Sequence, residues 1–158
     1  MPQGLACAPR VFTKLLKPFF ATMREQGHTC MGYIDDSLIV GRTFEECKLA
    51  VDSLVSGFES LGFVINQKKS VITPVHEITF LGYILNTKDM TIRLPSDKIA
   101  HIVDACSDLL QKSWIKLREL AQVIGLMNAY TNGVEHGKLH YRTLEKLKAT
   151  GLKMNKVY

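Results

Sequence analysis

The chain has 158 residues, 46% of them hydrophobic and 22% charged, which is typical of one compact globular domain, alone or with a small appendage, and excludes a disordered chain. No apolar run approaches the length of a membrane span, and the N-terminal residues form no signal-peptide pattern. The formal net charge is +5, and the excess lies in residues 80–158, with twelve Lys/Arg against seven Asp/Glu, since residues 1–79 hold eight of each. A surface that binds a polyanion and an ordinary solvated basic face both fit this placement.

The cysteines are widely spaced and form no C-x-x-C pair. Isolated cysteines of this kind behave as small hydrophobic residues. We therefore expect buried thiols of an intracellular protein, located in the cytoplasm or the nucleus, at Cys7, Cys30, Cys47 and Cys106.

The first predicted element is a helix over residues 9–27. Pro9 suits its first turn, Pro18 is expected to bend it, and Gly27 is a plausible C-terminal stop. Its apolar residues recur at helical spacing and form one stripe, at Val11, Phe12, Leu15, Leu16, Phe19 and Met23. For most of these residues, a place in an ordinary core helix is the simplest interpretation.

Residues 31–41 contain the most informative pattern, one acidic pair, Asp35-Asp36, inside an apolar run. The run is too short for a helix and rich in β-branched and aromatic residues, so it predicts two strands joined by a tight turn with the acids at its tip. Two adjacent carboxylates at the end of a mostly buried hairpin repel each other and lose hydration, and a divalent cation such as Mg²⁺ or Mn²⁺ would balance them. A solvated acidic turn without a metal is the alternative, which the hairpin taken by itself favours.

One helix and then several extended segments are predicted after this hairpin. Thr43-Phe-Glu-Glu46 is a capping box that begins an amphipathic helix, and Gly62 closes that helix. Four extended segments follow, at residues 63–65, 71–73, 78–85 and 90–93, the last two joined by a turn.

Two helices are predicted next, and they form a helical hairpin. Ser96 can cap the first, over residues 96–110, and residues 111–113 separate it from the second, over residues 117–127. The order of elements along the chain predicts an α+β fold.

The C-terminal segment, residues 136–158, is basic, with six Lys/Arg and one acid. We expect it to form a basic helix or a linker. His136 and His140 are four residues apart, but with no third ligand in view a solvated face is favoured over a zinc site.

Four segments carry a family signature in order along the chain: residues 1–12 (MPQGLACAPRVF), 33–36 (YIDD), 62–69 (GFVINQKK) and 80–84 (FLGYI). They resemble the successive palm motifs of reverse transcriptases, with the nearest likeness to retrotransposon polyproteins of the DIRS and gypsy-like kind. Two further runs, at residues 118–125 (RELAQVIG) and 137–142 (GKLHYR), are similar to the thumb of that group and to the segment that leads to its RNase H domain. Each motif alone is weak, but four in order at this spacing are specific.

The resemblance implies a fold and an activity. The fold would be a partial polymerase palm, with antiparallel strands, packed helices and a catalytic β-hairpin, followed by an α-helical thumb. The activity would be RNA-directed DNA synthesis, in which the primer 3′ hydroxyl attacks the α-phosphate of a deoxynucleoside triphosphate and two Mg²⁺ or Mn²⁺ ions stabilise the charge. The partners would be an RNA or DNA template–primer duplex and deoxynucleoside triphosphates, with no membrane.

The resemblance also assigns roles to residues. Asp35 would be a direct metal ligand and Asp36 a supporting or second ligand. Lys69 matches a lysine near the triphosphate that neutralises or protonates the leaving pyrophosphate, and a solvated turn lysine is an equal alternative. The nucleotide-binding positions would be Gln3, Gly4, Tyr33 and Ile34. The hairpin that grips the primer would be Phe80, Leu81, Gly82 and Tyr83, of which Leu81 and Tyr83 also fit core positions.

The sequence departs from the family pattern at the metal site, which needs a further aspartate from a strand before the Met-Pro-Gln-Gly segment. The only acid before Asp35 is Glu25, so we expect a fragment that lacks the fingers and the first catalytic strand, and that has no polymerase activity by itself. Its parts would be a partial palm, a helical thumb and a basic connection toward an RNase H domain, at residues 1–94, 95–131 and 132–158. A non-catalytic nucleic-acid-binding remnant of a mobile element is the main alternative, and an unrelated α+β domain with an acidic turn is a weaker one.

Overall fold

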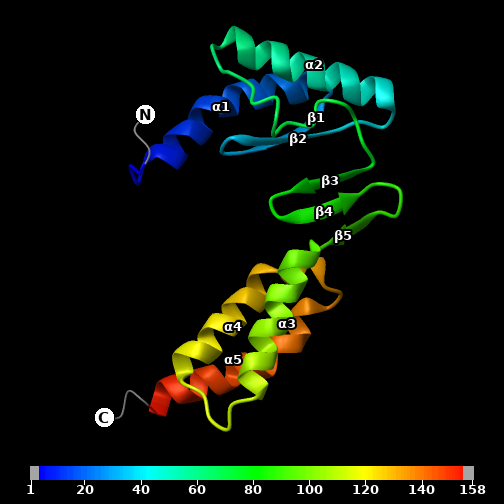
Figure 1. Cartoon of the computed structure of the whole chain (residues 1–158). Coiled ribbons are helices and arrows are strands. Elements are labelled where there is room, and N and C mark those ends of the chain that lie inside the picture. The colour runs from blue at the N-terminus through cyan, green and yellow to red at the C-terminus, as the bar shows by residue number, and fades with distance from the viewer. Residues whose placement is uncertain (1–3, 155–158) are drawn as a thin grey trace. The chain divides into compact units, whose positions relative to one another are not determined.

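The computed structural model describes residues 4–154, which form two compact units, one ending at residue 75 and the other beginning at residue 76. Each unit has its own helices and its own antiparallel strands (Figure 1). The predicted α+β fold class is confirmed. No helix in the described part of the chain combines the length and the apolar character that crossing a membrane requires.

The first unit is built from one hairpin and two helices. In chain order these are α1 (Ala8–Glu25), β1 (Thr29–Tyr33), β2 (Asp36–Val40) and α2 (Phe44–Ser60). α1 contacts β1 and α2 contacts β2, so the helices hold the hairpin from which the acidic pair projects.

The predicted helix ends of this unit are confirmed. Gly27 follows α1 with φ +90°, and its amide donates to the carbonyl of Arg24 over 3.0 Å. The Thr43 hydroxyl accepts a hydrogen bond from the Glu46 amide at 3.1 Å, and the Glu46 carboxylate accepts one from the Arg42 amide at 3.1 Å. The first two bonds satisfy backbone groups that a helix end leaves without a partner inside the helix. The third uses the Arg42 amide, one residue before the N-cap Thr43, where a full capping box would use the Thr43 amide.

Phenylalanine rings form the centre of this unit. Phe20 and Phe58 are buried with ring centroids 6.0 Å apart, and Phe19 lies 4.7 Å from Phe58. Phe63, beyond α2, packs against Phe58 at 5.6 Å and against Phe12 at 5.9 Å. Aromatic pairs of this kind add roughly 0.5–1.5 kcal/mol beyond the area that they bury. Four further buried residues complete the core, Leu16, Met23, Cys30 and Leu54.

The strands predicted at residues 63–65 and 71–73 are wrong, since neither segment forms a strand. In the first, Phe63 and Ile65 pack on the core while Val64 is 95% exposed. The alternation of packed and exposed side chains at residues 63–65 thus results from packing against the core, and this segment pairs with no strand.

The expectation of four buried cysteines holds only for Cys30, which is 7% exposed. Cys7 is exposed, and Cys47 and Cys106 are half-buried. Burial raises the pKa of the Cys30 thiol, an effect that the nearby Arg24 guanidinium partly offsets.

The second unit joins a three-stranded antiparallel sheet to three helices. The strand order is β3 (Glu77–Phe80), β4 (Tyr83–Asn86), β5 (Thr91–Arg93). The helices are α3 (Ser96–Leu110), α4 (Leu117–Ala129) and α5 (Gly137–Met154), with a short 3₁₀ turn, η1 (Thr131–Gly133), before α5.

The single strand predicted over residues 78–85 is wrong, because the chain turns in the middle of it. Leu81 and Gly82 have φ +47° and +81°, and Phe80 pairs with Tyr83 across the resulting hairpin. An apolar run with one internal glycine fits either a strand with a local irregularity or a tight turn, and periodicity does not separate the two.

Helices α4 and α5 share a small core. Leu120, Ile124 and Tyr141 are each less than one tenth exposed. The Tyr141 hydroxyl donates to Asn128 Oδ1 over 3.0 Å, so the polar end of this buried ring has a partner. Residues 137–154 of the basic C-terminal segment therefore form a helix that packs on its own unit.

α3 begins differently from the prediction. Pro95 occupies the position before the first helical residue, and no side chain caps the helix, so the capping role predicted for Ser96 is wrong. Leu94, which directly precedes Pro95, is 6% exposed and packs against Gly133. A Cβ added to Gly133 would lie 2.7 Å from the Leu94 Cγ. Burial of Leu94 against η1 thus marks this boundary.

The compact units divide at residues 75 and 76, so β3–β5 belong with the helices that follow them. The functional boundaries expected at residues 94/95 and 131/132 do not coincide with that division. The assignment of palm, thumb and connecting segment stays a prediction.

Candidate functional site

The acidic pair lies at the turn of the β1–β2 hairpin, as predicted. The register pairs Tyr33 with Asp36 and leaves Ile34 and Asp35 as the two turn residues. Ile34 has φ +55°, a left-handed backbone that β-branched residues rarely adopt. Two-residue hairpin turns with positive φ match the right-handed twist of the paired strands. Strand pairing therefore imposes this conformation on Ile34 although neither turn residue is glycine.

The two faces of the hairpin have different surroundings, because side chains alternate along a strand. Cys30 and Gly32 face the core, and a side chain on Gly32 would lie 2.2 Å from the Phe20 ring. Asp36 and its cross-strand partner Tyr33 share the opposite face, where Tyr33 is 57% exposed. The core therefore fixes one face and leaves the acidic face open.

Asp35 and Asp36 are both exposed. The prediction of a mostly buried hairpin whose acids lose hydration is therefore wrong, because only one face of the hairpin packs on α1. Repulsion between neighbouring carboxylates remains as the physical reason for a cation at the turn.

The acidic pair suits a divalent cation but does not complete a site. Within residues 4–154, neither Asp35 nor Asp36 forms an ion pair, and no group of three or more His, Cys, Asp or Glu could hold a metal. Two exposed carboxylates offer the hard oxygen ligands that Mg²⁺ and Mn²⁺ prefer. They fit as part of a metal site that needs further ligands.

The predicted nucleotide-binding residues are accessible where the structure describes them. Tyr33 and Ile34 flank the acids on the β1 side of the turn. Gly4 is exposed with φ +97°, and no atom lies within 4 Å of the place where its Cβ would be. Gln3 lies outside the described residues.

Lys69 lies in an exposed turn after α2. Its amide donates to the Asn66 carbonyl over 3.1 Å, and its side chain forms no ion pair in the part of the chain that the structure describes. These contacts are equally those of a solvated turn lysine, so its role stays a prediction.

The residues predicted to grip a primer form the turn between β3 and β4. Leu81 is 43% exposed at its tip. The Tyr83 hydroxyl donates to the carbonyl of Ala129, the last residue of α4, over 2.6 Å. A side chain on Gly82 would lie 2.1 Å from Lys98 Nζ. The turn is thus held against α3 and α4, a contact that sequence analysis missed and that only the glycine within a strand pattern could have signalled.

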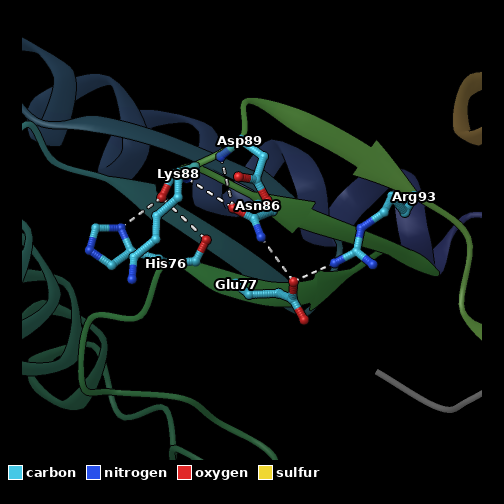
Figure 2. A network of polar contacts seen from close by, with 7 residues as sticks. His76, Glu77, Asn86, Lys88, Asp89 and Arg93 are labelled. Atoms are coloured by element: carbon cyan, nitrogen blue, oxygen red, sulfur yellow. Dashed lines mark hydrogen bonds and ion pairs between the residues drawn. The ribbon is translucent and has the colours of Figure 1, made fainter.

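A polar network fixes the other end of this sheet (Figure 2). Glu77 Oε2 accepts a hydrogen bond from Asn86 Nδ2 over 3.0 Å and pairs with Arg93, so one carboxylate joins all three strands. Asn86 Oδ1 accepts from the amides of Lys88 and Asp89 at 2.9 and 3.1 Å, which closes the β4–β5 turn. The network is a structural support for the β3–β4 hairpin.

Neither of two cavities suits a nucleotide at the predicted site, because one is too small and the other lies away from the predicted site residues. One of about 120 Å³ lies between α1 and the first hairpin, beside Lys17, Arg24 and Ile34, well below the usual volume of a ligand pocket, roughly 300–1,000 Å³. The other, about 550 Å³, is an open groove between α3 and α4 that no predicted site residue lines. Lys112 and Glu119 pair within it at 2.6 Å.

Comparisons with known proteins support the resemblance to reverse transcriptases. The family described as reverse transcriptase (RNA-dependent DNA polymerase) matches residues 1–85. The chain is 31% identical over 87 residues to the Gag-Pol polyprotein of gibbon ape leukemia virus and 30% identical over 87 residues to that of koala retrovirus. The matched region is 54% of this chain and 5% of each polyprotein, so the chain spans a small part of these relatives.

Two solved structures share the fold. The foamy viral protease-reverse transcriptase dRH in complex with double-stranded DNA matches with a TM-score of 0.72 and 24% identity, over 94% of this chain and 24% of that one. The foamy viral protease-reverse transcriptase in complex with an RNA/DNA hybrid matches with a TM-score of 0.62 and 23% identity, over 95% and 19%. The family match covers more than half of the sequence and includes the YIDD turn. The chain belongs to the reverse transcriptase (RNA-dependent DNA polymerase) family.

Proposed function

We propose that the chain is a segment of an RNA-directed DNA polymerase from a retrotransposon polyprotein of the DIRS or gypsy-like kind. Residues 1–94 would be part of its palm and residues 95–131 its thumb, with residues 132–158 leading toward an RNase H domain. The observation that carries the proposal is the exposed Asp35–Asp36 turn on a hairpin whose other face packs on α1, inside the family-matching residues 1–85.

Asp35 would hold a catalytic cation directly and Asp36 would support it. Mg²⁺ or Mn²⁺ supplies charge stabilisation at the α-phosphate under attack by the primer 3′ hydroxyl. The protein's part is to place the carboxylates, and the packing of Gly32 on Phe20 limits how far the turn can move. The exposed Tyr33 ring and Ile34 would contact the nucleotide or the primer end, while Lys69 would neutralise the leaving pyrophosphate.

These 158 residues by themselves are not expected to synthesise DNA. Two carboxylates leave most of a cation's coordination to water, and no third acidic ligand gathers near them in residues 4–154. A displacement of about 1 Å in a reacting group costs on the order of a hundredfold in rate. Activity would need further segments of the same polyprotein.

Binding of a template–primer duplex is the part of the function that this chain can carry alone. α5 presents Lys138, Arg142 and Lys146 at four-residue spacing, all exposed, and none forms an ion pair with another described residue. Like charges at this spacing repel one another on an isolated helix, and the phosphates of a duplex would relieve that repulsion. The foamy viral relatives of similar fold are described in complex with DNA and with an RNA/DNA hybrid.

The test combines duplex binding with primer extension. The chain should bind a fluorescently labelled RNA-template/DNA-primer duplex with an affinity that falls steeply as salt rises. It should yield no extension product with Mg²⁺ or Mn²⁺. A template-dependent product from the chain alone would contradict the inactivity, and a lack of duplex binding at low salt would contradict the assigned partner.

A non-catalytic nucleic-acid-binding remnant is the second candidate, favoured by the exposure of both acids. A double substitution, Asp35→Asn with Asp36→Asn, separates the two. In the polymerase segment, Mg²⁺ and a complementary nucleoside triphosphate should tighten duplex binding by the native chain, and the double variant should lose that gain. In a pure binder the variant should bind equally well or better under all conditions, because two negative charges are gone.

A further inference from the structure

Lys98, in the first turn of α3, packs closely against other residues of the second unit. A Cβ on Gly82 would lie 2.1 Å from Lys98 Nζ, so the ammonium fills the space that any side chain at position 82 would need. The ring of Tyr130, directly after α4, lies with its centroid 5.1 Å from the same nitrogen. The side chain therefore lies between a bare backbone and an aromatic face instead of extending into solvent.

The ammonium of Lys98 has no carboxylate partner among residues 4–154. The ion pairs on neighbouring elements join Arg93 to Glu77 and Lys112 to Glu119. Asp97, the adjacent residue of α3, is exposed and forms no ion pair with it. Lys98 is half-buried, so it loses hydration that the aromatic face only partly replaces. Its charge is available to an anion from outside the unit.

The turn beside this charge is fixed to the same helix end. Leu81 and Gly82 both have left-handed backbones, and the Tyr83 hydroxyl is bonded to the carbonyl of Ala129. Because Ala129 and Tyr130 are consecutive, the turn and the ammonium are both anchored where α4 ends. Their relative position is set before any ligand arrives, which lowers the cost of ordering them on binding.

We propose that Lys98 binds a backbone phosphate of the primer strand at the Phe80–Tyr83 turn. The proposal rests on the proposed function, since it names a residue for the duplex contact. A lysine ammonium is a compact point charge suited to one phosphate oxygen. Because Gly82 has no side chain, Nζ lies directly against the turn, where a sugar–phosphate backbone that reaches the turn would meet it. Tyr130 and Tyr83 act as positioning residues for the charge and for the turn.

The test measures how duplex binding by the full chain depends on salt. Each neutralised phosphate contributes about 0.9 to the slope of log K against log salt for a B-form duplex. Lys98→Met removes the charge and keeps the apolar stem, and it should lower the slope by about 0.9. Lys88→Met is the matched control, because it removes the same charge from the turn at the other end of β4, and it should change the slope by less than half as much. Lys98→Arg keeps the charge and its packing on the ring and should preserve the slope.

A second arm locates the phosphate and needs no protein variant. Neutral methylphosphonate linkages in the last few positions of the primer should reduce the slope for the native chain as Lys98→Met does, and should cause no further reduction for that variant. The same linkages in the template strand are the control. If neutral primer linkages leave the slope of the native chain unchanged, this proposal is overturned, even if Lys98→Met unfolds the second unit. The proposed function would then still stand. If the native chain binds no duplex at all, both fail.

Discussion

Replacing Gly32 by alanine tests whether the core fixes the acidic turn. The added Cβ would lie 2.2 and 2.4 Å from Cε2 and Cζ of Phe20. Phe20 is 6% exposed, and its ring lies 5.8 Å from Phe19 and 6.0 Å from Phe58. The ring therefore cannot turn aside without disturbing the aromatic cluster, so either the core or the hairpin must shift.

The expected cost follows from two opposing effects. Forcing an extra methyl into a packed core costs about 1–3 kcal/mol. Alanine also restricts the unfolded chain relative to glycine, which returns about 0.4–1 kcal/mol. A contact of 2.2 Å with a ring that cannot turn aside belongs to the upper part of the first range, so the first unit should lose about 1–2.5 kcal/mol of unfolding free energy.

The measurement is amide hydrogen exchange under native conditions, followed separately for α1 and α4, because two compact units need not unfold together. Gly125→Ala is the control, since no atom lies within 4 Å of its added Cβ in the middle of α4. That change should stabilise α4 by about 0.5–1 kcal/mol. If Gly32→Ala left the protection of α1 unchanged or raised it, the argument that Phe20 fixes the hairpin would be refuted.

Three further predictions concern the exposed turns, the thiols and the acid range. Met90 has φ +53° and is 85% exposed, so Met90→Asn should raise the unfolding free energy of the second unit by up to about 1 kcal/mol, and an unchanged thermal midpoint would contradict backbone strain there. Cys7 is exposed, whereas burial raises the pKa of the Cys30 thiol, so a thiol reagent at neutral pH should modify Cys7 far faster, as peptide mass spectrometry would show. The pKa of Glu119 lies below its usual range because Lys112 donates a hydrogen bond to it. The stabilisation that the ionised Glu119 side chain gives the fold should therefore be complete above the ordinary glutamate pKa of about 4.3 and be lost as the pH falls through the lower folded-state pKa. Glu119→Gln should remove this contribution to the acid dependence of thermal unfolding. A variant that kept the full acid dependence would contradict the assignment.

The features that local chemistry decides were the ones best predicted from the sequence. The Thr43–Glu46 cap and the Gly27 stop each depend on a few neighbouring residues, and both are confirmed. The hairpin around Asp35 also followed from composition and length. Local signals of this kind carry the same meaning in most folds, so they could be interpreted without knowledge of the packing.

The wrong predictions depend on contacts between distant segments. The turn at Leu81 forms although leucine disfavours a left-handed backbone, because Tyr83 and Lys98 attach this hairpin to helices that lie later in the chain. The hairpin of the acidic pair was expected to be buried because it is apolar, yet Met31 and Val40 on its open face are 51% and 45% exposed. Composition counts apolar residues, but it does not say how many faces of a hairpin are covered.

The central claim is that Asp35 and Asp36 hold a divalent cation. It is tested most directly by titrating the chain with Mn²⁺ and recording paramagnetic broadening of backbone amide signals by NMR. The account predicts broadening that begins at residues 34–37, is competed by Mg²⁺, and disappears in the double variant with Asp35→Asn and Asp36→Asn. Broadening that begins elsewhere, or that the double variant retains at these amides, would contradict it.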